Sequence, residues 1–261
     1  MKVIYFDCTN GISGDMAYAA LLGLLGEGAD AARAEIEKLG LHEHSPDDGH
    51  GHKHESGHGH KHESEQTCGR EQINGQTHEH GRQSDNHSHR GYSEIKNIIN
   101  SSGISASAKE KALSIYSVIA EAEASVHGTT VCDVHFHEVG RDKAIENIVG
   151  AAVCIDAMGV EKILCSAIYD GKGFVECSHG TIPVPVPAVM AMREKCGLTF
   201  ETDENVNTEM VTPSGLAMLV GLGAEYSGEI PQGAVLRKAV ARGGRETGRG
   251  GGLSAYLVEL E

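Results

Sequence analysis

A polar, histidine-rich tract at residues 42–91 limits what this chain can fold into more than any other feature. Twelve of the sixteen histidines lie between His42 and His89, and the octapeptide GHGHKHES occurs twice in succession, at residues 49–56 and 57–64. A segment of this composition has too little apolar mass to pack a core, so we expect a disordered insertion. The other roughly 210 residues, 1–41 and 92–261, are then expected to fold as one α/β domain.

The tract also predicts a protein that handles a borderline metal ion. Neutral imidazole is a common nitrogen ligand of nickel, zinc and copper. The tract histidines that we expect to bind metal lie in the two repeats: His50, His52, His54, His58, His60 and His62. Two interpretations stay open, because a duplicated, solvated loop can buffer metal without delivering it to a defined site.

Charge and cysteine content exclude several classes of partner. The formal net charge is −15, of which the tract carries −4 and the rest of the chain −11, so the surface repels nucleic acid and anionic membranes. The seven cysteines include no C-x-x-C pair and are typical of reduced cytoplasmic thiols. The N-terminus lacks signal-peptide features, and no apolar run approaches the ~18 residues of a transmembrane helix. We expect a cytoplasmic protein with neither nucleic acid nor membrane as a partner.

Hydrophobic periodicity predicts alternating strands and helices. The expected strands are residues 2–7, 131–139, 162–168, 173–177, 234–241 and 253–260, with a hairpin turn at 169–172 and a C-terminal hairpin formed by the last two. The expected helices begin at residue 15, lie near residue 38, and cover 94–99, 105–127, 143–158, 188–195 and 216–222. The helix at 105–127 carries a wide apolar stripe and is expected to end with Gly128 as its C-cap, and Thr212 with Pro213 is expected to cap the start of the last helix. This order predicts an α/β or α+β layered fold with a mixed sheet.

Residues 7–15 form a glycine-containing loop between the first strand and the first helix. Gly11 and Gly14 let the backbone approach a ligand closely, Ser13 offers a hydroxyl, and the start of the helix presents amide N–H groups, so the loop can hold a phosphate. Asp7 and Asp15 can hold a hard cation beside it. The alternative is an ordinary strand-to-helix turn in which Asp15 caps the helix.

The segment Cys132-Asp-Val-His135-Phe-His137-Glu138 is the best ligand cluster outside the tract. On a strand, His135 and His137 project to one face and can bind one ion, while Cys132 and Glu138 face the other side unless a bulge turns them. Alternatively, the two histidines are half-buried polar residues at a strand end. His127 ends a predicted helix and is expected to be stabilised by the helix dipole.

Two further patterns carry chemistry. Cys177 and His179 place a thiol and an imidazole two residues apart, which indicates a metal ligand more than a nucleophile because no carboxylate adjoins them. Arg242, Arg245 and Arg249 lie in a glycine-rich loop of an otherwise acidic chain and are expected to clamp phosphate or carboxylate. A solvated hairpin loop is the alternative for the arginines.

Several blocks that occur in order resemble the LarC family of nickel insertion proteins: YFDCTNGISGDM, the His tract, EAEASVHG, VHFHEVG, IVGAAVCIDAMGV, VECSHGTIPVPVPA, VTPSG and RGGRETGRGG. The resemblance implies a cytosolic cyclometallase, a lyase that inserts Ni²⁺ into pyridinium-3,5-bisthiocarboxylic acid mononucleotide and uses CTP with Mg²⁺ or Mn²⁺. The reaction it implies forms a carbon–nickel bond between two thiocarboxylate sulfurs. The implied recipient of the product is a lactate racemase-type enzyme.

By position, ten residues match motif residues of the family: Asp7, Gly11, Ser13, Gly14, Asp15, His135, His137, Glu138, His179 and Thr212. We expect catalytic roles for both aspartates and for His135 and His137, and ligand binding by the glycine loop, Thr212 and the arginines. Cys132, Glu138 and His179 are the further metal ligands expected.

Three departures from the family bear on the expected activity. Family members are commonly longer, and the resemblance assigns the nucleotide site and the oligomer contacts to a C-terminal part, so we expect a separate C-terminal subunit and a homo-oligomer. Lys143 and Asn147 stand where aspartates are usual, which alters or removes a metal site if those aspartates bind metal. A stretch usually present after Leu41 is missing, which would expose a sheet edge.

Two rival functions make different predictions. A non-catalytic nickel store or metallochaperone would lose several weak nickel sites together when residues 42–89 are deleted, and would not bind the mononucleotide. A metal-dependent phosphohydrolase built on Asp7, Ser13 and Asp15 would release phosphate from nucleotides with Mg²⁺ or Mn²⁺. The paired blocks VHFHEVG and SHGTIPVPVPA favour nickel insertion, because a store needs neither.

Overall fold

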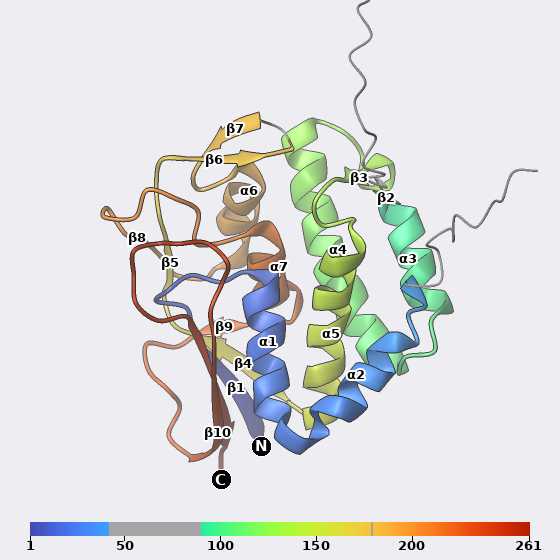
Figure 1. Cartoon of the computed structure of the whole chain (residues 1–261), viewed down its shortest axis with the longest axis vertical. Helices are drawn as coiled ribbons and strands as arrows, with labels where there is room; N and C mark the ends of the chain where they lie inside the picture. Colours follow the sequence, from blue (N-terminus) through green and yellow to red (C-terminus); the bar gives the residue numbers. More distant parts are fainter. Residues whose placement is uncertain (42–89, 179) are drawn as a thin grey trace, which may run out of the picture. The chain divides into compact units, whose positions relative to one another are not determined.

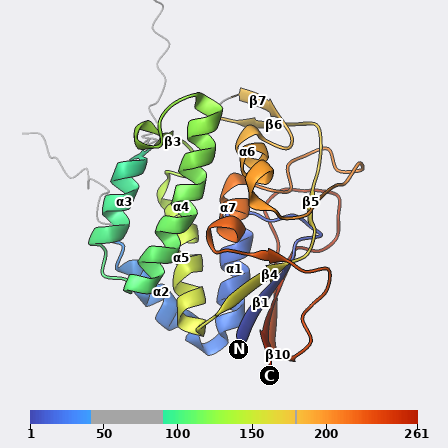
Figure 2. The same cartoon turned by 180° about the vertical axis from the view of Figure 1, so that it is seen from behind.

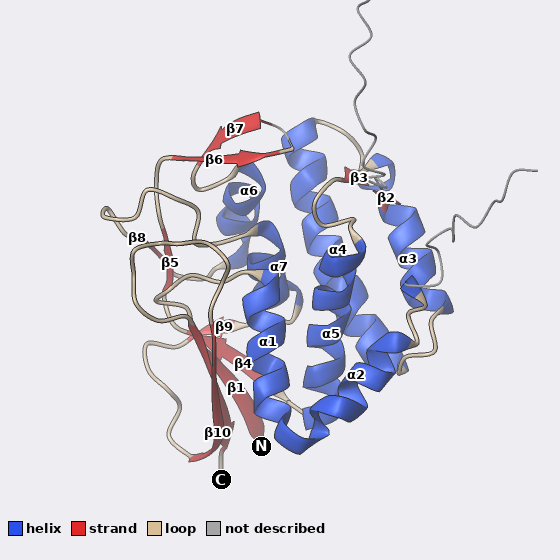
Figure 3. Cartoon of the chain, viewed as in Figure 1, coloured by secondary structure: helices blue, strands red, loops and turns tan. Residues whose placement is uncertain are grey.

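Five strands form the main sheet of the computed structural model, which describes residues 1–41, 90–178 and 180–261. The strand order is β10 (Ala234–Ala241), β11 (Leu253–Glu259), β1 (Lys2–Asp7), β4 (Lys162–Cys165) and β9 (Glu225–Tyr226). β11 pairs antiparallel with both β10 and β1, whereas β4 pairs parallel with both β1 and β9. The expected mixed sheet and C-terminal hairpin are therefore confirmed (Figure 3).

The helices gather on one side of this sheet (Figures 1 and 2). They are α1 (Gly14–Leu25), α2 (Ala29–Glu37), α3 (Tyr92–Ser101), α4 (Ala106–His127), α5 (Asp142–Met158), α6 (Pro187–Cys196) and α7 (Pro213–Gly221). α1 contacts both the sheet and α5, and α4 packs against α3, α5, α6 and α7. Because α4 has helices on several sides, Ile115, Tyr116 and Ile119 are fully buried, as its wide apolar stripe predicted.

Local capping chemistry sets the helix ends that border the site. The Ser105 side chain accepts a hydrogen bond from the Ala108 amide at 3.0 Å, and Gly128 ends α4 in the left-handed conformation. Thr212 caps α7 in the same way, with its hydroxyl 3.2 Å from the Gly215 amide and Pro213 in the first turn. These predicted ends are confirmed.

Three two-stranded sheets complete the fold. They pair β2 (Arg90–Gly91) with β3 (His135–Phe136), β5 (Ile168–Asp170) with β8 (Phe200–Thr202), and β6 (Phe174–Cys177) with β7 (Gly180–Pro183). Arg90–Gly91, which the sequence placed in the insertion, thus belongs to the folded part. The rest of the insertion, residues 42–89, lies outside the described residues together with its predicted disorder and metal ligands.

Two predicted strands are wrong in ways that matter for the site. Residues 131–139 do not form one strand, because a 3₁₀ turn (Val131–Asp133) is closed by the Thr130 hydroxyl on Asp133 at 2.8 Å, and only His135–Phe136 pair. Residues 162–177 do not form a hairpin around 169–172. Instead β5 pairs parallel with β8, and the hairpin is formed one strand later, between β6 and β7.

Candidate functional site

The glycine loop, residues 7–15, lies against the segment that leads into α7. The Ile12 amide donates to the Met210 carbonyl at 3.0 Å, and the Thr212 amide donates to the Ile12 carbonyl at 3.0 Å. Gly11 has φ +76°, and a Cβ there would lie 2.2 Å from the Met210 oxygen; one at Gly14 would lie 2.7 Å from the Ser214 hydroxyl. The close approach that the two glycines allow is therefore with the protein's own chain, and it fixes the loop beside Thr212.

The polar side chains of the glycine loop are engaged with one another. One Asp7 carboxylate oxygen accepts from the Thr9 amide at 3.2 Å and from its hydroxyl at 2.7 Å. The Ser13 hydroxyl donates to the Asp15 carboxylate at 2.5 Å. Ser13 and Asp15 face a cavity, whereas Asp7 is not among the residues that line it.

This first cavity, of about 540 Å³, separates the glycine loop from the arginine loop, residues 242–252. We call it the arginine cavity. The structure brings to it six of the residues singled out from the sequence: Ser13, Asp15, Thr212, Arg242, Arg245 and Arg249. A hydroxyl-bearing loop that faces several guanidinium groups is chemically suited to a phosphate.

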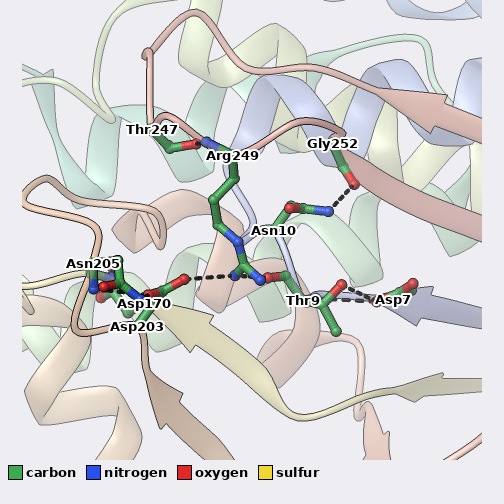
Figure 4. A network of polar contacts seen from close by, with 10 residues as sticks. Asp7, Thr9, Asn10, Asp170, Asp203, Asn205, Thr247, Arg249 and Gly252 are labelled. Carbon is green, nitrogen blue, oxygen red and sulfur yellow. Dashed lines mark hydrogen bonds and ion pairs between the residues drawn. The ribbon is translucent and has the colours of Figure 1, made fainter.

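The three arginines differ in what they already contact. The Arg249 guanidinium donates to the Thr9 carbonyl at 2.7 Å and lies 3.2 Å from an Asp203 carboxylate oxygen (Figure 4). The Asn10 side chain also reaches the Gly252 carbonyl at 3.3 Å. These contacts tie the arginine loop to the glycine loop, so Arg249 positions the loop. Arg242 and Arg245 have exposed side chains that a ligand can reach.

A second cavity, of about 500 Å³, is bordered by the segment after α4 and by the β6–β7 hairpin. We call it the imidazole cavity. Its polar lining includes His127, His135, His137, Glu138 and Cys177, and its apolar wall includes Val139, Val175, Ile182 and Val186. His135 and His137 thus face one cavity, as their alternation predicted, although the strand that carries them is only two residues long.

The other candidate ligands are distributed unevenly. Cys132 lies on the 3₁₀ turn, is exposed and does not line the imidazole cavity. His179 lies outside the described residues. His127 lines the cavity and pairs with Glu123 at 3.3 Å, one helical turn earlier. Within the ranges 1–41, 90–178 and 180–261, no three His, Cys, Asp or Glu side chains come together in a group that can hold a metal ion.

Glu138 presents a charged carboxylate to the imidazole cavity. Its carboxylate accepts from the Ser178 amide at 3.0 Å and from the Ser178 hydroxyl at 2.6 Å. Partial burial alone would raise the pKa of Glu138, but the two hydrogen bonds from Ser178 outweigh it and the net pKa is lowered. Glu138 is therefore ionised at neutral pH and adds negative charge beside His137.

Glu209 is a site residue that sequence reasoning missed. It is only 5% exposed, its carboxylate lies 3.0 Å from the Arg245 guanidinium, and it lines both cavities together with Thr212 and Arg245. Burial raises the pKa of Glu209 to about 7; Arg245 opposes this, and the carboxylates of Asp170 and Glu138 add to it. The sequence offered little to identify Glu209 as a site residue: it directly precedes the apolar pair Met210-Val211 and lies three residues before Thr212, the cap of α7.

Asp170, expected to be a hairpin turn residue, holds Glu209 in place. It is 2% exposed, and one carboxylate oxygen accepts from the amides of Gly171 and Met210 at 2.8 Å each and of Val211 at 3.2 Å. Its other oxygen is buried with no hydrogen-bond partner among the described residues. Burial raises the pKa of Asp170. Asp170 therefore ties β5 to the backbone that carries Glu209.

Lys143 and Asn147, which replace usual aspartates, both lie on α5 but in different surroundings. The Lys143 side chain is exposed and pairs with Glu146 at 3.2 Å, whereas Asn147 is buried. Neither lines the imidazole cavity, although Ala144, between them, does.

The geometry defines a class of protein: an α/β protein with two adjoining cavities, one lined by imidazole and carboxylate side chains and the other by guanidinium and hydroxyl groups. The family model described as nickel insertion protein matches residues 4–259, and the chain belongs to this family. The resemblance seen in the sequence motifs is thereby confirmed.

Three relatives illustrate the similarity. Proteins named pyridinium-3,5-bisthiocarboxylic acid mononucleotide nickel insertion protein are 37% identical in Acetivibrio thermocellus, 38% in Clostridium kluyveri and 34% in Lactiplantibacillus plantarum. The matches cover 98%, 88% and 99% of this chain but 60%, 55% and 62% of the respective relatives. The chain thus spans about 60% of the length of these relatives.

No solved structure matches this chain. In the described part of the chain, no helix combines the length and the apolar character that crossing a bilayer requires.

Proposed function

We propose that this chain binds Ni²⁺ and pyridinium-3,5-bisthiocarboxylic acid mononucleotide in its two cavities and brings the metal to the substrate's sulfur atoms. The observation that carries the proposal is that the imidazole cavity and the arginine cavity share Thr212, Glu209 and Arg245. The two cavities therefore adjoin, and we propose that one ligand occupies both.

The two cavities suit the two ends of such a substrate. Its phosphate matches the exposed guanidinium groups of Arg242 and Arg245 and the Ser13 hydroxyl. Its flat pyridinium ring suits the apolar wall of the imidazole cavity, which includes Val175 and Ile182. This orientation brings the thiocarboxylates toward His135 and His137.

Nickel is a substrate here, and the protein needs to hold it only until transfer. The two imidazoles and the Glu138 carboxylate line one cavity but do not come together as a metal-binding group of three, so they suit weak rather than permanent binding. Thiocarboxylate sulfurs are softer ligands that can complete the coordination. Loose binding by nitrogen followed by capture on sulfur favours transfer. In this proposal the tract histidines supply nickel.

The whole activity is proposed to require more than these residues. We assign the CTP requirement, with its Mg²⁺ or Mn²⁺, and the contacts of a homo-oligomer to the part of the relatives that this chain does not cover. The proposed setting is the cytoplasm, and the proposed recipient of the product is a lactate racemase-type enzyme.

The test is calorimetric titration of Ni²⁺ into the whole chain and into a variant lacking residues 42–89, with and without the mononucleotide. We expect the shortened chain to bind one nickel more tightly in the presence of the mononucleotide. His135→Ala and His137→Ala should weaken this site, whereas Cys132→Ser, outside the cavity, should not.

A different outcome would favour the nickel store. If all nickel binding disappears with residues 42–89 and the mononucleotide has no effect, the tract is the active part and the insertion proposal fails. Phosphate release from nucleotides with Mg²⁺ or Mn²⁺ would instead support the phosphohydrolase.

A further inference from the structure

An ion pair between Glu209 and Arg245 lies where the two cavities meet. The two residues line both cavities, and their side chains approach to 3.0 Å. The Glu209 side chain is 6% exposed, whereas that of Arg245 is 47% exposed. The pair therefore joins a buried carboxylate to a guanidinium that solvent and ligands can reach.

The two partners are held very differently. The backbone beside Glu209 is fixed by Asp170, which accepts from Met210 and Val211, and by the hydrogen bonds between Ile12 and the same segment. Arg245 lies in the arginine loop, where six of the eleven residues 242–252 are glycine. Glycine restricts the backbone little, so the part of the loop that carries Arg245 is held less firmly than the segment that carries Glu209.

We propose that, before a ligand binds, Glu209 holds the Arg245 guanidinium where the two cavities meet, and that a phosphate monoester then replaces Glu209 as the partner of Arg245. This exchange would remove the ion pair from between the two cavities. The identity of that phosphate as the mononucleotide's rests on the proposed function. Arg245 is then a substrate-binding residue and Glu209 a positioning residue that competes with the substrate.

The exchange is chemically reasonable on both sides. A phosphate monoester carries more negative charge than a carboxylate and offers three acceptor oxygens, so it is the stronger partner for a guanidinium. Once Arg245 has left, the buried Glu209 carboxylate can take up a proton and become neutral. Burial, with the nearby Asp170 and Glu138 carboxylates, raises its pKa to about 7 even with Arg245 beside it, so a single proton can neutralise it.

A second ion pair of the same loop provides a matched control. Arg249 pairs with Asp203 at 3.2 Å and also donates to the Thr9 carbonyl, so this pair ties the loop down. Asp203 does not line either cavity. Glu209→Gln and Asp203→Asn each remove one negative charge from a residue that pairs with the arginine loop. The proposal nevertheless predicts opposite effects on phosphate affinity, with an increase for Glu209→Gln and a decrease for Asp203→Asn.

The experiment measures binding of inorganic phosphate and of a pyridine mononucleotide that lacks sulfur, by calorimetry, without nickel. Glu209→Gln should tighten binding of both probes by up to about fivefold, the range expected when a competing ion pair with an exposed partner is removed. Asp203→Asn should weaken binding, and Arg245→Gln should abolish the gain when it is added to Glu209→Gln. Circular dichroism checks that each variant is folded.

A measurement on the unaltered chain keeps the proposal testable if Glu209→Gln does not fold. In ¹⁵N spectra of arginine side chains, phosphate should shift the Arg245 Nε signal, assigned with Arg245→Lys, and leave that of Arg249 in place. The proposal is overturned if folded Glu209→Gln binds phosphate no more tightly than the unaltered chain, or if the Arg245 signal does not respond. Because nickel is absent throughout, neither result depends on the nickel titration.

Discussion

Replacing Glu209 by glutamine should stabilise the protein, and increasingly so as the pH rises. Glu209 is 5% exposed, and burial raises its pKa from the ordinary 4.5 to about 7. The folded state therefore binds the Glu209 proton more tightly than the unfolded state does. The resulting stabilisation is fully present below about pH 4.5 and is lost as the pH rises through about 7. Glutamine has nearly the same shape and cannot ionise, so it avoids this loss.

The size of the effect follows from the two pKa values. Between pH 5 and pH 8, a carboxyl group with a pKa of 4.5 in the unfolded chain and about 7 in the folded chain loses about 2.5 kcal/mol of folding free energy. The advantage of Glu209→Gln over the unaltered chain should grow by that amount over the same range. The contribution of Arg245 is already contained in the value of about 7.

The assay is urea unfolding of both proteins at pH 5, 6, 7 and 8, with the difference in unfolding free energy taken at each pH. Glu204→Gln is the control: it removes an exposed carboxylate from a neighbouring segment together with its ion pair to Lys172, and measures what the loss of an exposed ion-paired charge does over the same pH range. If the difference for Glu209→Gln stays constant between pH 5 and pH 8, burial does not raise the pKa of Glu209 in the folded chain. If the difference shrinks as the pH rises, the ion pair with Arg245 dominates instead.

Three other predictions concern how the site is held. Gly11→Ala should lower the free energy of unfolding by at least about 2 kcal/mol more than Gly40→Ala does. Both glycines have positive φ, but only a Cβ at Gly11 meets the Met210 oxygen, and chemical denaturation of the two variants measures the difference. Asp170→Ala should lower the free energy of unfolding by about 3 kcal/mol, because it leaves buried amides without an acceptor. Asp170→Asn keeps an acceptor oxygen and should lower it by about 1 kcal/mol or less; equal losses in the two variants would contradict this. Ser105→Ala should cost about 1 kcal/mol in a thermal melt, and no change would mean that the cap is not significant.

Sequence reasoning predicted the parts of this fold that local chemistry determines. Ser105 and Gly128 fix the ends of α4, and Thr212 with Pro213 fixes the start of α7, because each capping interaction involves residues only a few positions apart. The alternation of His135 and His137 likewise predicted that both face the same side, which the imidazole cavity confirms.

The failures share a physical cause, which is competition from distant contacts. Asp170 has the composition of a turn, yet its carboxylate binds the amides of Met210 and Val211, forty residues away, so the expected hairpin does not form. The side chain of Phe136 packs between Tyr92 and Tyr116, with ring centroids 6.1 and 5.9 Å away, and anchors a segment that was expected to be a full strand. Neither contact has a signature in the local sequence.

The same competition explains why Glu209 had no signature, although it lies where the two cavities meet. A glutamate beside a methionine and a valine is unremarkable until β5, the glycine loop and the arginine loop enclose it. Once enclosed, it destabilises the fold at neutral pH, because burial raises its pKa and Arg245 offsets that rise only in part. A glutamine would avoid the cost and still fill the space. A costly ionisable group between an imidazole-lined and an arginine-lined cavity is better explained by the proposed ligand exchange than by stability, since its charge pairs with Arg245 before a ligand binds and a proton can remove that charge afterwards.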